Sequence, residues 1–75
     1  MKLNNIKTNV TEVITNDGTV IMFSYNTPVA ARLPNYDYVR TGEYYSRTTS
    51  KHINQWLDGV NAETVEQNFI DNLVA

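Results

Sequence analysis

Apolar and polar side chains alternate in several short segments before residue 46, which is the pattern of β-strands. The segment Thr8–Thr15 is rich in β-branched residues and is followed by Asp17-Gly18, a pair that favours a hairpin turn. The next segment, Thr19–Tyr25, is apolar on both alternating faces, so it predicts a central strand covered on both sides. Two further alternating segments, Val29–Leu33 and Tyr38–Tyr45, predict the remaining strands of an antiparallel sheet.

The loop of the first hairpin leaves two strand registers open. A two-residue loop places Ile14 opposite Ile21, whereas a three-residue loop places Ile14 opposite Val20. Because neighbouring residues of a strand point to opposite faces, the two registers assign Ile14 to different sides of the sheet. Both registers, and both faces of the sheet as the buried one, stay open at this point.

After residue 52 the apolar residues recur at intervals of three and four, which is the repeat of one buried helical face. These residues are Ile53, Trp56, Leu57 and Val60. Thr48, Thr49 and Ser50 are the candidates for the N-terminal cap, and Gly59 suits a left-handed C-terminal cap. We therefore expect a helix whose apolar ridge docks on the strands.

A second helix is expected to begin at Asn61 as its cap and to run to Val74. Glu63 would lie in its first turn, where a negative charge is favourable. Strands followed by helices are typical of the α+β class. The sequence thus predicts one domain over residues 1–75, in which an antiparallel sheet of three to four strands precedes two C-terminal helices packed on one face (ββββαα).

The composition narrows the range of functions. The 75 residues carry a formal net charge of −2, which argues against a strongly basic nucleic-acid binder. The absence of cysteine and a single histidine leave neither a disulfide nor the usual ligands of a structural zinc site, so we expect no metal and no cofactor. No apolar run has the length of a signal peptide or a membrane span, so we expect a cytoplasmic protein without membrane contact.

Nucleophilic catalysis has candidate groups here but no predicted arrangement. Ser50 and His52 are two residues apart on the expected helix, so their side chains do not face each other. The sequence has no nucleophile elbow and no glycine-rich phosphate loop, and a chain this small has little volume for a pocket. We therefore expect no enzyme. A helix-turn-helix is not expected either, because the second helix carries acids and no lysine or arginine.

The candidate binding residues gather around the start of the first helix and the strand before it. They are Tyr38, Arg40, Tyr44, Arg47, Thr48, Thr49, Lys51 and His52. Free N–H groups and cations at a helix start favour an anion, and tyrosines beside cations can stack on unpaired bases. Tyrosine and arginine also dominate protein–protein hot spots. The negative net charge favours a protein partner, a second copy in a homodimer included, and a nucleic acid is the alternative.

Three segments form a recognisable pattern: FSYNTPVAA (Phe23–Ala31), YVRT (Tyr38–Thr41) and SRTTSKHINQWLDG (Ser46–Gly59). They resemble a family of small uncharacterised proteins found largely in bacteriophages and their relatives. The resemblance spans residues 23–59 and brings no established activity, so it assigns no catalytic or binding residue. It implies a phage accessory protein. Together with the expectations from the residues, this predicts a non-enzymatic protein that binds a macromolecule in the host cytoplasm. A host or phage protein is the favoured partner, and the alternative is a small nucleic-acid-binding protein.

Overall fold

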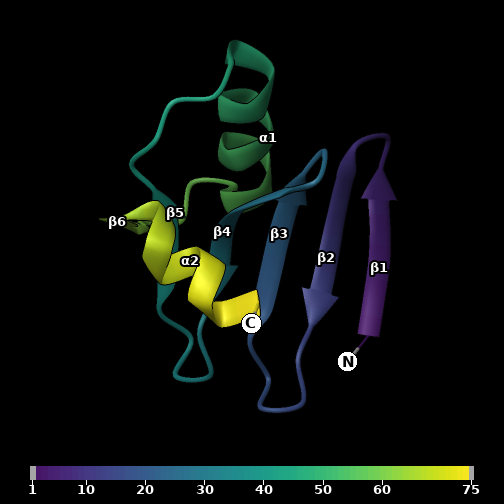
Figure 1. The fold of residues 1–75 in the computed structure, drawn as a ribbon, viewed down its shortest axis with the longest axis vertical. Coiled ribbons are helices and arrows are strands. Elements are labelled where there is room, and N and C mark those ends of the chain that lie inside the picture. Colours follow the sequence, from purple (N-terminus) through teal and green to yellow (C-terminus); the bar gives the residue numbers. More distant parts are fainter. Residues whose placement is uncertain (1, 75) are drawn as a thin grey trace.

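The computed structural model describes residues 2–74 as a six-stranded sheet with two helices (Figure 1). The strands are β1 (Lys2–Lys7), β2 (Val10–Ile14), β3 (Val20–Ser24), β4 (Thr27–Arg32), β5 (Tyr38–Thr41) and β6 (Glu63–Val65). The helices are α1 (Arg47–Leu57) and α2 (Gln67–Val74). The strands lie side by side in chain order, and neighbours are antiparallel except for β5 and β6. The α+β class is confirmed, and the sheet has more strands than the sequence predicts.

β5, α1 and β6 form a βαβ unit, because β6 returns parallel to β5. The backbone N–H of the residue after β5 donates to the carbonyl of Val65 at 2.9 Å. The prediction of a helix that begins at Asn61 with Glu63 in its first turn is therefore wrong, since α2 begins only at Gln67. The β-branched side chains of Thr64 and Val65 favour an extended backbone, and the open edge of β5 supplies hydrogen-bond partners for it.

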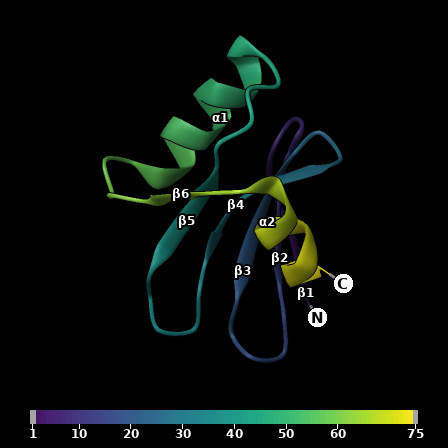
Figure 2. The same ribbon diagram turned by 60° about the vertical axis from the view of Figure 1, so that its left-hand side comes forward.

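The two helices cover opposite faces of the sheet (Figures 1 and 2). Ile53 and Leu57 of α1 share a buried cluster with Met22, whereas Leu73 of α2 packs against the cluster that contains Ile21. Neighbouring residues of β3 point to opposite faces, so these two clusters lie on the two sides of the sheet. The prediction that both helices pack on one face is wrong. The predicted burial of this strand on both sides is confirmed, because Ile21 and Met22 are fully buried.

The edge strand β1 is not predicted by the sequence. Its two apolar residues, Leu3 and Ile6, do not alternate regularly, and both side chains are largely exposed. A register shift between Asn5 and Lys7 interrupts the pairing of β1 with β2. The positive φ of Asn9, 66°, belongs to the turn between them, so β2 begins two residues later than expected.

The first predicted hairpin joins β2 to β3 and has the register of a three-residue loop. Ile14 pairs with Val20, and the next pair is closed by the N–H of Thr15, which donates to the carbonyl of Thr19 at 2.9 Å. The carboxylate of Asp17 accepts hydrogen bonds from the Thr15 hydroxyl and from the N–H of Thr19. These two hydrogen bonds hold the pKa of Asp17 below its ordinary value of 3.8, and the bond from the Thr15 hydroxyl has the larger effect.

Ser46 caps the N-terminus of α1, and the expected caps at Thr48, Thr49 or Ser50 are wrong by two to four residues. The Ser46 hydroxyl accepts a hydrogen bond of 3.1 Å from the N–H of Thr49, a residue already inside the helix. At the other end Asp58 is left-handed with φ 49°, and Gly59 follows with φ 84°, so the predicted C-terminal break is confirmed. Within residues 2–74 neither helix has the length and apolar character needed to cross a bilayer.

The apolar ridge of α1 docks on the sheet as predicted. Ile53 and Leu57 are buried, and the half-buried ring of Trp56 meets the ring of Tyr38 edge-on, with centroids 5.8 Å apart. The indole N–H of Trp56 also donates to the carboxylate of Glu12 at 2.6 Å. The ridge thus joins α1 both to the centre of the sheet and to β2 and β5.

Candidate functional site

Four of the predicted binding residues are exposed around the start of α1. They are Tyr44, Arg47, Thr48 and Lys51. The hydroxyl of Thr41 accepts a hydrogen bond of 3.0 Å from the N–H of Glu43, and β5 ends there. Tyr44 and Tyr45 therefore lie in the loop before α1, and the predicted strand that extended to Tyr45 is too long. Because Tyr44 lies outside β5, it does not share a face of that strand with Tyr38 and Arg40, and its side chain is 74% exposed.

Tyr38 and Arg40 lie on the face of β5 that α1 covers. Their alternation with Val39, which joins the cluster on the α2 side, is as predicted. Tyr38 is half-buried under Trp56. The guanidinium of Arg40 donates to the side-chain oxygen of Asn54 in α1 at 3.3 Å. Both residues therefore join the strand to the helix.

Thr49 and His52 are buried in a polar cluster beneath the first turns of α1. The hydroxyl of Ser24, at the end of β3, donates to the Thr49 hydroxyl at 3.1 Å and lies 2.8 Å from Nδ1 of His52. The direction of the second hydrogen bond follows the imidazole tautomer. The hydroxyl of Ser46 also donates to Thr49, at 3.2 Å. The ring of Tyr25 lies beside His52, with centroids 5.9 Å apart.

Ser24 is the residue of this cluster that sequence reasoning missed. It lies 28 positions before His52, and no local pattern connects them. Only the register of β3 under α1 brings the two side chains together. A serine bonded to a histidine resembles part of a catalytic arrangement, but Ser24 is 2% exposed and His52 8%. Both side chains are buried, and the cluster joins the start of α1 to the end of β3.

Three hollows of the described surface meet around β6. The first is lined by residues of β5, α1 and the loop after α1, and it shares Gly42 and Thr64 with the second. The second shares Val65 with a third hollow, which lies between Leu33 and Phe69. β6 is the last strand of the sheet in residues 2–74, and its outer edge pairs with no other strand of that part of the chain. The hollows and this edge form one continuous surface.

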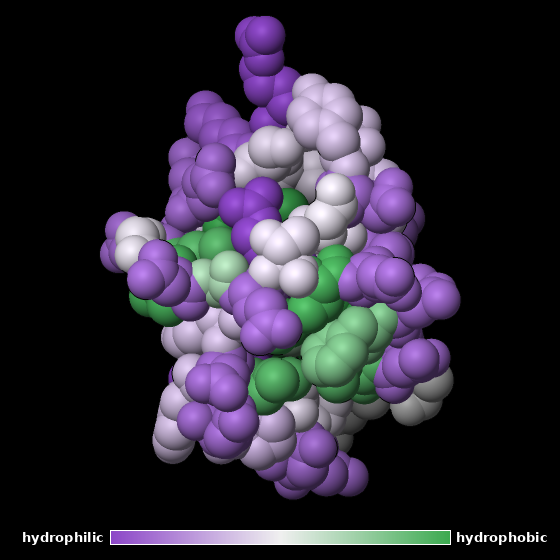
Figure 3. Space-filling view, turned by 90° about the vertical axis from the view of Figure 1, so that its left-hand side faces the viewer, coloured by the Kyte–Doolittle hydropathy of each residue, from purple (hydrophilic) through white to green (hydrophobic). Residues whose placement is uncertain are grey.

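We call the two hollows that meet at Val65 the β6 surface. It is lined by Leu33, Asp37, Tyr38, Val39, Asn61, Glu63 and Phe69 on one side and by Gly42, Glu43, Thr64, Glu66, Gln67 and Asn68 on the other. Figure 3 shows this side of the molecule, with apolar residues gathered across its middle and lower part and hydrophilic residues around them. Phe69 keeps 42% of its surface exposed. Val60, which the sequence predicts on the buried ridge of α1, lies beyond the helix end and is 43% exposed.

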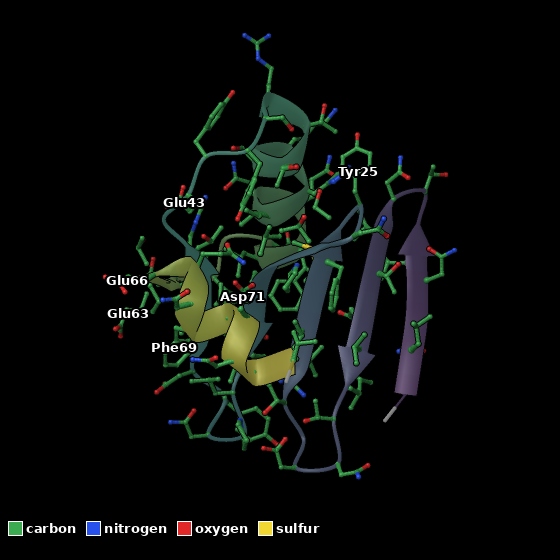
Figure 4. All side chains as sticks on the ribbon, in the orientation of Figure 1. Tyr25, Glu43, Glu63, Glu66, Phe69 and Asp71 are labelled. Carbon is green, nitrogen blue, oxygen red and sulfur yellow. The ribbon has the colours of Figure 1, made fainter. Side chains whose placement is uncertain are left out.

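Acidic side chains surround the apolar part of the β6 surface. Figure 4 shows Glu43, Glu63 and Glu66 on the same side of the molecule as Phe69, with Asp71 on α2. Burial raises the pKa of the Tyr45 hydroxyl above 10.0, and the negative charges of Glu43 and then Asp71 raise it further. Within residues 2–74 no hydrogen bond is accepted by the carboxylates of Glu63 and Glu66. Their charges therefore face the solvent.

Comparison with known proteins places the chain in a family. Residues 1–72 match the model of DUF8033, a family of unknown function. The chain belongs to DUF8033. The match takes in β1, β6 and most of α2, so it extends on both sides of the segment that carries the sequence resemblance. Comparisons with curated proteins and with solved structures found no match.

Proposed function

We propose that this chain is a non-enzymatic accessory protein, of phage type, that binds another protein through the β6 surface. The observation that carries the proposal is the exposure of Phe69 beside the hollow at the open edge of the sheet. A small domain that can bury only part of its apolar surface gains stability from each aromatic ring it covers. Exposed apolar side chains that gather around a hollow are typical of interaction sites.

A protein partner is favoured over a nucleic acid because of the charges at this surface. The hollows that meet at Val65 have four carboxylates along them and no lysine or arginine among the described residues that line them. Phosphate groups would be repelled there. The exposed cations Arg47 and Lys51 lie instead on the first turns of α1. Of the predicted contacts around them, Thr49 and His52 are buried, whereas Tyr44 and Thr48 are exposed.

Photo-crosslinking tests this proposal. A benzophenone amino acid replaces Phe69 in one variant and Tyr25 in a matched control. Tyr25 is also a partly exposed aromatic residue, but it lies at the β3–β4 turn away from β6 (Figure 4). We expect a protein adduct from position 69 and none of the same mass from position 25 in phage-infected bacterial cells. The purified adduct partner should bind the unmodified chain and lose affinity for Phe69→Ala.

Two results would contradict the proposal. One is the same set of adducts from both positions, which would indicate random collision. The other is a nucleic-acid adduct from position 69, which would favour the alternative function. Salt titration of the purified complex separates these cases further, because phosphate-dominated binding weakens steeply as salt is added.

A further inference from the structure

We infer that the partner of the β6 surface presents a basic segment, rich in lysine or arginine, with one apolar side chain that enters the hollow between Leu33 and Phe69. The inference rests on the proposed function and names the chemistry of the partner. It is carried by two features of the same surface, its apolar floor and its uncompensated acidic rim.

The apolar floor lies in the hollow on the β4–β5 side of the β6 surface. Leu33, Val39, Val65 and Phe69 all line it, and they come from four different parts of the chain. Leu33 and Val65 are half-buried and pack against the core cluster of Val39, whereas Phe69 stays substantially exposed. A single apolar side chain of a partner would extend this cluster and cover the ring of Phe69. Burial of that kind is typical of the anchor residue at a protein interface.

The rim of the β6 surface is negative. Five of the eight acidic residues of the chain lie on it or directly beside it. They are Asp37, Glu43, Glu63, Glu66 and Asp71. The chain's net charge of −2 understates this local excess, because the described cations lie elsewhere.

The positions of the arginines show why the rim keeps its charge. The Arg40 guanidinium is bonded to Asn54, and the Arg32 guanidinium lies over the ring of Tyr36, 5.2 Å from its centroid. Arg47 begins α1, beyond the loop that follows β5. None of these cations lines the two hollows that meet at Val65.

A basic segment fits these two features together. Its cations would meet the carboxylates of Glu63 and Glu66, which accept no hydrogen bond within the described chain, so no internal bond of these two has to break when the partner binds. In the same part of the chain, Asp37 and Asp71 accept hydrogen bonds only from the neutral amides of Asn35 and Gln67. The attraction also steers the partner toward the surface before contact, and it weakens as salt screens the charges. The apolar anchor then fixes where along the surface the segment stops.

Peptide binding tests the inference. The probe is a fluorescein-labelled peptide with a central leucine flanked on both sides by lysines. One comparison peptide has glutamates in place of the lysines, and another has alanine in place of the leucine. Fluorescence anisotropy measures the dissociation constant of each for the full chain at low and at physiological salt.

The variants isolate the two features. The double variant Glu63→Gln/Glu66→Gln should weaken binding of the lysine–leucine peptide by about tenfold at low salt, and less when salt is added. Phe69→Ala should weaken it by about fivefold to tenfold at both salt concentrations. The matched control is Asp17→Asn, which removes one carboxylate at the β2–β3 turn, with β3, β4 and β5 between that turn and β6. It should leave the affinity unchanged within about twofold.

The inference falls if the glutamate peptide binds as tightly as the lysine peptide, or if the double variant binds the lysine–leucine peptide unchanged. Equal losses from Asp17→Asn and from the double variant would indicate general attraction to a negative protein, which also overturns it. Equal affinity of the leucine and alanine peptides would remove the anchor. In each of these cases protein adducts from position 69 would still support the proposed function. Peptide binding without any adduct from position 69 would instead contradict the proposed function.

Discussion

The replacement Ser24→Ala tests whether the buried polar cluster fixes α1 on the sheet. The change removes a hydroxyl that forms hydrogen bonds with Thr49 and His52 at 3.1 Å and 2.8 Å. A buried hydrogen bond adds about 0.5–1.5 kcal/mol net, so the loss of two lowers the free energy of unfolding by about 1–3 kcal/mol. At about 0.05–0.15 kcal/mol per residue, a domain of this size has roughly 4–11 kcal/mol in total. The substitution therefore removes a large part of the stability without touching the apolar core.

Urea unfolding followed by the fluorescence of Trp56, the single tryptophan, measures this loss. With a slope of about 1 kcal/mol per molar urea for a small domain, the midpoint should fall by about 1–3 M. The matched control is Ser50→Ala. Ser50 is a half-buried serine of α1, and within residues 2–74 its hydroxyl forms no hydrogen bond. Its free energy of unfolding should change by no more than about 0.5 kcal/mol.

A double-mutant cycle with Thr49→Val sharpens the test. Because Ser24 and Thr49 are in direct contact, their combined effect should differ from the sum of the single effects by about 0.5 kcal/mol or more. Coincident midpoints for Ser24→Ala and Ser50→Ala, or strictly additive effects in the cycle, would refute the reasoning. Either result would mean that α1 is held by its apolar ridge alone.

Three further predictions follow from the core and from the two shifted pKa values. Ile53→Ala should lower the free energy of unfolding by about 2–5 kcal/mol in the same urea assay, because it empties a fully packed site, and an unchanged midpoint would mean that α1 does not dock there. The hydrogen bonds from Thr15 and the Thr19 backbone lower the pKa of Asp17, so this carboxylate stabilises the fold above pH 3.8 and the gain is lost as the pH falls below that value. Asp17→Asn should therefore reduce the acid sensitivity of the urea midpoint, and an identical pH profile would contradict the hydrogen bonds. Burial and the negative charges of Glu43 and Asp71 raise the pKa of Tyr45 by disfavouring its ionised form, so the stability present below pH 10.0 is lost as the hydroxyl ionises above that pH. Ultraviolet titration against Tyr45→Phe should show this pKa falling in Glu43→Gln.

The elements that could be predicted from the sequence are those whose signal is local. The Asp-Gly turn, the two-sided apolar segment around Ile21 and Met22, and the helical spacing of Ile53 and Leu57 each specify an element within a few residues. The structure confirms all three. The apolar residues on both faces of β3 also implied that a helix covers each face of the sheet. Two helices packed on a single face would leave the other face of β3 exposed.

The missed features depend on contacts between residues far apart in the chain. β6 is a strand because the edge of β5 is open beside it, and a three-residue segment has too few positions to show a periodic pattern. The Ser24–His52 hydrogen bond depends on where α1 crosses β3. The predicted binding set gathered residues by their closeness in sequence. The fold separates them, because Thr49 and His52 point inward while Arg47 and Lys51 point to solvent.

The acids beside β6 are open to two explanations, and the exposed ring of Phe69 separates them. A short edge strand with charged neighbours is a common protection against pairing with other sheets, and Glu63 and Glu66 fit that role. Protection alone does not account for an aromatic side chain left exposed beside them, because an apolar ring at an edge favours the association that the charges would prevent. A binding surface accounts for both the acids and the exposed ring, since the charges repel unsuitable partners and the ring is buried only by a partner that fits it. If the acids only protected the edge, Phe69→Gln would improve solubility and change no complex. If they select a partner, the same substitution would weaken the complex and leave the free domain folded.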